Sequence, residues 1–170
     1  MIRTMIFLSL CCINFTVHGQ SKVKCNTASE RLPIYSEQIS SNSIEASLNV
    51  WKLTKDNLKK REISSTTPVE KIYNTFLNAY QKENLEEHLF YNTKIIQDIT
   101  NPFSHNRIIQ AKFPNSHDFD LFFIEVKNDN NEFFMKTIIV PRIEQNSVQE
   151  AVAFINDLST KTVNKCQNNE

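Results

Sequence analysis

Glycine is almost absent from this chain, and its absence restricts the turns that the backbone can make. The single glycine is Gly19, and the rest of the 170-residue sequence has none. Turns that need a positive φ must therefore use asparagine or aspartate, which tolerate that conformation best after glycine. Phosphate-binding glycine loops and the G-x-S-x-G nucleophile elbow require glycine itself, so the sequence excludes both.

The first nineteen residues have the pattern of a secretory signal peptide. Arg3 precedes a largely apolar stretch from Met5 to Val17, and Val17 and Gly19 occupy the −3 and −1 positions of a cleavage site. We therefore expect residues 1–19 to be removed and the mature protein to be secreted, either to the extracellular space or to the periplasm. Since no later apolar run reaches the roughly 20 residues that cross a bilayer, we expect no transmembrane segment in the mature chain.

The mature chain is nearly neutral. The whole sequence has 19 basic and 19 acidic residues, so the loss of Arg3 with the signal peptide leaves a net charge of −1. Proteins that bind nucleic acid usually carry a basic surface, which this composition does not provide. We therefore expect no nucleic-acid partner.

Two cysteines remain after the signal peptide, one near each end of the mature chain. Cys25 and Cys166 in an exported protein most simply form one disulfide bond. The alternative is a metal site, which would need histidine ligands, and no histidine lies near either cysteine in the sequence. We therefore predict a disulfide and no metal or other cofactor.

The spacing of apolar residues predicts an α+β domain over residues 43–166. Residues 20–42 look like an irregular lead-in and residues 167–170 a short tail. A first helix is predicted over 43–61, since Ile44, Leu48, Trp51 and Leu58 would share one face.

Two more helices are predicted before the spacing of apolar residues changes from a helical to a strand period. The second begins at Thr67-Pro68-Val69-Glu70, which supplies a cap, a proline at the first helical position and a capping-box glutamate. The third begins at Asn84 and ends before Asn101-Pro102, with Leu85, Leu89, Ile96 and Ile99 as its buried face.

In the second half of the chain, apolar residues alternate as they do in β-strands. Residues 107–113, 119–127 and 132–140 are predicted strands, separated by turns at 114–117 and 128–131. A last helix is predicted over about 148–165. The expected fold is therefore α+β: N-terminal helices, a three-stranded antiparallel meander and a C-terminal helix.

The predicted strands are apolar on both faces, which is unusual for a meander with one solvated face. The phenylalanines that create this pattern are Phe122, Phe123, Phe133 and Phe134. Three interpretations remain open: the protein's own helices cover both faces, the sheet forms a homodimer interface, or an apolar ligand pocket lies against it.

No group of residues in the sequence predicts a catalytic or metal site. The run Ser116-His117-Asp118 has the residue types of a hydrolase triad, but consecutive side chains diverge. His105 and His117 with Asp118 and Asp120 match no known spacing of metal ligands.

These observations favour a secreted binding or interaction protein with no evident catalytic site. Its partner would be another protein or an apolar small ligand. The alternatives are a small-ligand carrier or pocket enzyme with an apolar cavity against the sheet, and a structural component of an envelope or secretion assembly.

Overall fold

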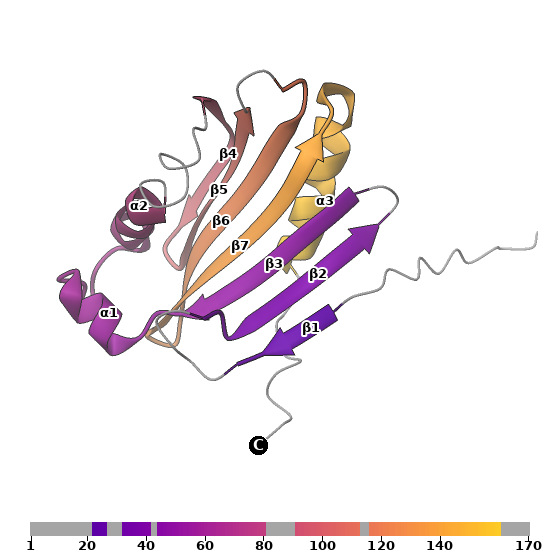
Figure 1. Cartoon of the computed structure of the whole chain (residues 1–170). Helices are drawn as coiled ribbons and strands as arrows, with labels where there is room; N and C mark the ends of the chain where they lie inside the picture. Colours follow the sequence, from indigo (N-terminus) through magenta and orange to yellow (C-terminus); the bar gives the residue numbers. More distant parts are fainter. Residues whose placement is uncertain (1–21, 27–31, 42–43, 81–90, 113–115, 161–170) are drawn as a thin grey trace, which may run out of the picture.

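A computed structural model describes residues 22–26, 32–41, 44–80, 91–112 and 116–160. These residues form one antiparallel sheet with helices on both faces (Figure 1). In chain order the elements are β1 (Lys22–Cys25), β2 (Tyr35–Ser41), β3 (Ile44–Lys52), α1 (Lys55–Lys60), α2 (Val69–Tyr80), β4 (Tyr91–Asn101), β5 (Ser104–Lys112), β6 (Phe119–Asp129), β7 (Glu132–Ile143), the 3₁₀ turn η2 (Gln145–Ser147) and α3 (Val148–Thr160).

The sheet has seven strands in the order β1-β2-β3-β7-β6-β5-β4. Strands β1 to β3 and strands β4 to β7 each run as a meander, and the two meanders join where β7 pairs with β3. The first strand in the sequence therefore lies at one edge of the sheet, and β4, from the middle of the sequence, lies at the other.

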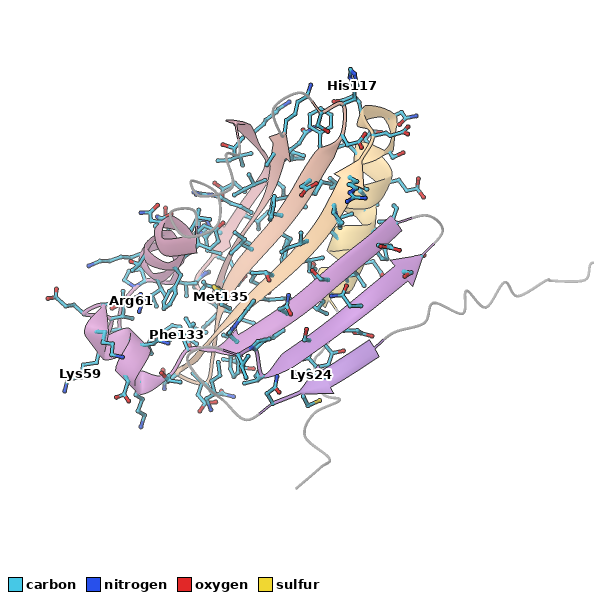
Figure 2. The ribbon with its side chains drawn as sticks, in the orientation of Figure 1. Lys24, Lys59, Arg61, His117, Phe133 and Met135 are labelled. Atoms are coloured by element: carbon cyan, nitrogen blue, oxygen red, sulfur yellow. The ribbon has the colours of Figure 1, made fainter. Side chains whose placement is uncertain are left out.

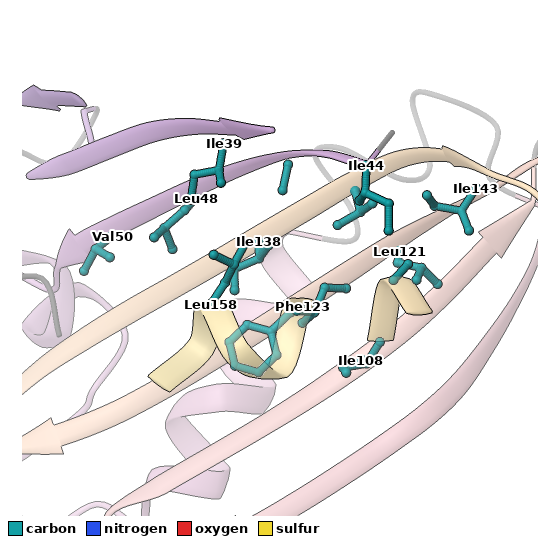
Figure 3. Close-up of a cluster of buried hydrophobic side chains, with 14 of the residues drawn as sticks. Ile39, Ile44, Leu48, Val50, Ile108, Leu121, Phe123, Ile138, Ile143 and Leu158 are labelled. Atoms are coloured by element: carbon teal, nitrogen blue, oxygen red, sulfur yellow. The ribbon is translucent and has the colours of Figure 1, made fainter. Parts of the chain in front are cut away.

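The helices divide the apolar side chains into two cores, one on each face. Successive residues of a strand point to opposite faces. On β6, Phe123 therefore packs with Leu158 and Ile138 beneath α3, whereas Phe122 packs with Ile72 beneath α2. Figure 3 shows the α3-side core, in which side chains from β2, β3, β5, β6 and β7 meet the helix.

The helix predicted over residues 43–61 is wrong. This segment is the strand β3 followed by the short helix α1, which starts after the N-cap Thr54. The buried residues of β3 are alternate ones: Ile44, Ala46, Leu48 and Val50. Ile44 and Leu48 fit both the helical period and the strand period, so the spacing of the largest side chains alone did not separate the two.

Two other expected features of the N-terminal half are also wrong. The C-terminal part of the predicted third helix is β4, and residues 81–90 lie outside the described residues. The predicted irregular lead-in contains β1 and β2. The fold is therefore mainly an antiparallel sheet, and the α+β arrangement with N-terminal helices is corrected.

Several predicted elements are confirmed individually. The second predicted helix is α2, the three expected strands are β5, β6 and β7, and the last predicted helix is α3. The turn between β6 and β7 uses Asn130 and Asn131, with φ values of 52° and 65°. Asparagine thus takes the turn conformation that glycine would usually adopt.

The ends of the chain are only partly described. The predicted signal peptide, residues 1–19, lies outside the described residues, as does the tail at 167–170. Cys25 lies at the end of β1, whereas Cys166, the other cysteine of the predicted disulfide, lies outside the described residues. No helix in the described ranges has the length and apolar character needed to span a bilayer.

Candidate functional site

The β4–β5 hairpin forms one edge of the sheet and carries an unusual share of exposed apolar side chains. Among the described residues, four large hydrophobic side chains are exposed, and three of them belong to this hairpin: Ile95 (52%), Ile99 (47%) and Phe103 (67%). The fourth is Leu32, ahead of β2. Edge strands are usually protected by charges, prolines or covering segments, because their free backbone groups attract other strands. An eleven-residue edge strand with exposed isoleucines is therefore a candidate binding surface.

An irregularity in β4 distributes these side chains over both faces of the sheet. Ile95 is aligned with Ile109, on the α2 side, and the register shifts before Gln97 aligns with Ile108. Ile99, aligned with Asn106, consequently lies on the α3 side. The apolar surface follows the edge itself, as a partner that lies along the strand would require.

A buried polar network lies beneath the hairpin on the α2 side. His105 of β5 is 1% exposed and stacks on Tyr73 of α2, with ring centroids 4.3 Å apart and an interplanar angle of 29°. The imidazole Nδ1 lies 2.8 Å from the Thr100 hydroxyl of the neighbouring strand. His105 Nε2 makes no hydrogen bond with the described residues, but Asp98 Oδ1 is 3.1 Å away, so this contact is electrostatic.

Arg107 connects the carboxylate to the helix. Its Nε donates a hydrogen bond to Asp98 Oδ2 at 2.8 Å, and its guanidinium lies 5.2 Å from the centroid of the Tyr73 ring. A cation over an aromatic face adds a favourable electrostatic contact. The network therefore attaches β4 and β5 to α2 through three kinds of contact: stacking, an ion pair and a cation–π contact.

Burial controls the protonation of the network. Burial lowers the pKa of His105, and the nearby Asp98 carboxylate opposes this effect. Burial also raises the pKa of the Tyr73 phenol. At neutral pH the network is therefore a neutral imidazole and a neutral phenol beside one ion pair.

The network has residue types found in catalytic triads, but its arrangement is that of a structural support. Thr100, His105 and Asp98 follow the order hydroxyl, imidazole, carboxylate. A general base must reach the proton that it removes from a bound substrate, and an imidazole that is 1% exposed is shielded from one. We therefore assign the network the role of holding the edge hairpin in place.

The hairpin is also held from the α3 side. The side chains of Gln97 and Asn156 are joined by amide hydrogen bonds of 3.3 and 3.4 Å, which link β4 to α3. The Ser104 hydroxyl at the start of β5 donates to Glu125 Oε1 at 3.0 Å. Helices on both faces thus fix the position of the edge.

Glu125 belongs to a second polar cluster, near the end of α3. Lys136 of β7 donates to the Ser159 carbonyl at 2.7 Å, and its Nζ lies 3.7 Å from Glu125 Oε2. Burial lowers the pKa of Lys136, while Glu125 opposes the shift. The lysine satisfies a carbonyl at the C-terminus of α3, a position that favours a positive charge.

The four phenylalanines singled out in the sequence occupy different environments. Phe122 and Phe133 belong to the core beneath α2, whereas Phe123 belongs to the core beneath α3 and Phe134 packs against it. Phe133 also lines a groove beside α1. Figure 2 shows it pointing into the space between α1 and the sheet. Their role in an interface or pocket stays a prediction.

The histidines considered as metal ligands lie at opposite ends of β5. His105 is near the start of the strand, whereas His117 is exposed in the connection that follows its end (Figure 2). In the part of the chain that the structure describes, no three His, Cys, Asp or Glu side chains gather in a way that could hold a metal ion.

The β4 edge is the feature that the sequence analysis missed. Interpretation of Ile96 and Ile99 as one face of a helix placed them in the core. A signal was present, since residues 93–100 contain five β-branched side chains: Thr93, Ile95, Ile96, Ile99 and Thr100. Such enrichment favours a strand over a helix.

Comparisons with known proteins give only a weak structural likeness. No protein family matches the chain, and no curated protein matches it. Among solved structures it is similar to PA94 from Pseudomonas aeruginosa, a protein of unknown function. The alignment covers 85% of this chain and 83% of that one, with 12% sequence identity and a TM-score of 0.38. Similarity at this level carries no argument about function, which must come from the residues of the site.

Proposed function

We propose that this protein is an interaction protein that binds an extended segment of another protein along β4. The observation that carries the proposal is the concentration of exposed apolar side chains, Ile95, Ile99 and Phe103, on one edge hairpin. An added strand would form backbone hydrogen bonds with the edge and pack side chains from both of its faces against the isoleucines.

The rigidity of the hairpin supports this function. Binding by strand addition costs less free energy when the receiving strand is already ordered. The Tyr73–His105 stack and the Gln97–Asn156 pair hold β4 and β5 from both faces before any partner arrives. The edge is therefore preorganised for a partner.

Site-specific crosslinking in the cells that make the protein would test the proposal. A photoreactive phenylalanine analogue at position 99 should give one adduct of defined mass. The same analogue at Lys127, an exposed residue of the interior strand β6, serves as the control and should give none. An adduct of twice the chain's mass would identify the partner as a second copy.

A charge variant completes the test. A variant that carries both I95K and the analogue at position 99 should form no adduct. The lysine ammonium group disfavours the apolar contact with the partner. Circular dichroism should show an unchanged fold, since the side chain at 95 is exposed. Equal adducts at positions 99 and 127, or an adduct that survives I95K, would contradict the proposal.

A further inference from the structure

A groove of about 500 Å³ lies where α1 and the loop after it meet the turn between β6 and β7. Its volume falls within the range of small-molecule sites, roughly 300–1,000 Å³. It is built from α1, the loop after it and the start of β7, whereas the proposed interaction surface is β4 at the sheet edge. The groove is therefore a separate feature of the molecule.

The floor of the groove is apolar and firmly held. It consists of Leu58, Ile63 and Phe133, of which Phe133 is 1% and Ile63 9% exposed. All three belong to the core beneath α2 or pack against it. Backbone hydrogen bonds fix the surrounding chain, from Leu53 N to the Phe133 carbonyl at 2.8 Å and from Ile63 N to the Leu58 carbonyl at 2.9 Å. Phe133 and Ile63 therefore support the groove from below, and Leu58, which is only partly buried, is the apolar side chain that a ligand can contact.

The rim of the groove carries an excess of positive charge. Lys55 and Lys59 are exposed and form no ion pair with any described residue, while Glu62 is the one acidic residue that lines the groove. The two lysines are four positions apart on α1, so their side chains are neighbours and repel each other. An anionic group between them would remove this repulsion and gain charge-assisted hydrogen bonds.

We infer that this groove binds an amphipathic anion, with its apolar body against Leu58, the least buried of the three floor residues, and its carboxylate or sulfonate at Lys55 and Lys59. The inference is independent of the proposed function at β4. Loss of one activity would leave the other intact, because no residue is shared between the two surfaces.

Titration of the full chain with 1-anilinonaphthalene-8-sulfonate, followed by fluorescence, tests this inference. The folded protein should bind the dye with saturation, and excess decanoate should displace it. The double variant K55E/K59E should bind at least about tenfold more weakly, the effect expected when charge-assisted contacts are replaced by repulsion. The matched control K94E/K127E reverses two exposed lysines elsewhere and should bind like the parent.

Two further measurements separate charge recognition from general stickiness. E62Q removes the acidic residue of the rim and should strengthen binding of the dye. The uncharged analogue N-phenyl-1-naphthylamine should bind K55E/K59E within about twofold of the parent, because it lacks the group that the lysines recognise. Circular dichroism should confirm that all variants remain folded.

The outcomes that would overturn the inference are equally specific. They are no saturable binding up to about 1 mM dye, equal binding by K55E/K59E and the parent, weaker binding by E62Q, or no displacement by decanoate. In each case the groove would be a surface depression without ligand specificity.

Discussion

Tyr73 of α2 stacks on His105 of β5, with ring centroids 4.3 Å apart, and this contact joins the helix to the edge hairpin of the sheet. Both side chains are fully buried. The polar partners of the imidazole come from β4, so the stack links a helix to two strands at once. The geometry of the exposed edge therefore depends on a buried contact on one face of the sheet.

The ring of Tyr73, rather than its hydroxyl, should provide this stability. The Tyr73 hydroxyl has no hydrogen-bond partner among the described residues. Y73F should therefore leave the free energy of unfolding unchanged or raise it slightly, since a buried hydroxyl without a partner is unfavourable. Y73L should lower it by about 2 kcal/mol through loss of the stack and of packing. Urea unfolding measures both, and a large loss in Y73F would show that the hydroxyl does have a partner.

Stability should fall as the pH drops below about 6.5, the ordinary pKa of histidine in an unfolded chain. Burial lowers the pKa of His105 in the folded state, so the unfolded chain takes up the proton first, and acid favours unfolding. The groups facing the imidazole are Asp98, Arg107, Glu70 and Tyr73. Asp98 favours the protonated form, so D98N should make the pH dependence steeper.

Urea unfolding between pH 7.5 and pH 5 checks this prediction. For one titrating histidine, the free energy of unfolding changes by at most about 1.4 kcal/mol per pH unit. H105N should flatten the profile in this range, whereas H117N, at an exposed histidine, should leave it unchanged. The prediction would be contradicted if H117N flattened the profile and H105N did not.

Asp120 should destabilise the fold when it is ionised. Burial raises the pKa of its carboxyl, although the backbone N–H of Arg142 donates a hydrogen bond to Oδ1 at 3.0 Å. D120N keeps an oxygen that accepts this bond and removes the charge, so Tm should exceed that of the parent at pH 7. The gain should disappear near pH 3, where the aspartate is protonated in both states. The exposed Asp129 is the control, and D129N should not reproduce the gain.

The turn between β6 and β7 should gain stability from glycine. Asn131 has a φ of 65°, and its N–H donates to the Asn128 side-chain oxygen at 3.0 Å. N131G keeps that backbone donor and should raise the free energy of unfolding by roughly 0.5 kcal/mol, because glycine adopts positive φ at no steric cost. N131A should lower it by about 1 kcal/mol. Thermal unfolding of the two variants compares them directly, and a more stable N131A would contradict the turn conformation.

The interpretation of local patterns succeeded where one residue type decided the conformation. The proline and capping box at Thr67-Pro68-Val69-Glu70 were sufficient to predict the start of α2. The asparagines at 130 and 131 were sufficient for the turn, because few other residues tolerate positive φ. The strands beside that turn followed from their alternating apolar residues.

The same reasoning failed where the spacing of apolar residues fitted two periods. Ile44 and Leu48 lie on one face of a helix and also on one face of a strand. Only the burial of Ala46 and Val50 shows that the segment is a strand and not a helix. That burial depends on contacts with β7 and α3, which lie far away in the sequence. The β4 edge was missed for the same reason.

The sequence by itself determined the turns, the helix starts and the apolar strands of the second half, because these depend on residues close together in the chain. Only the tertiary structure decided which strand is an edge, which face each phenylalanine occupies and that Phe133 meets Lys55 and Lys59 at a groove. Strand order and groove formation arise from contacts between distant segments. The free energy of these contacts comes from burying apolar surface. Several different folds with the same local sequence pattern could bury that surface equally well.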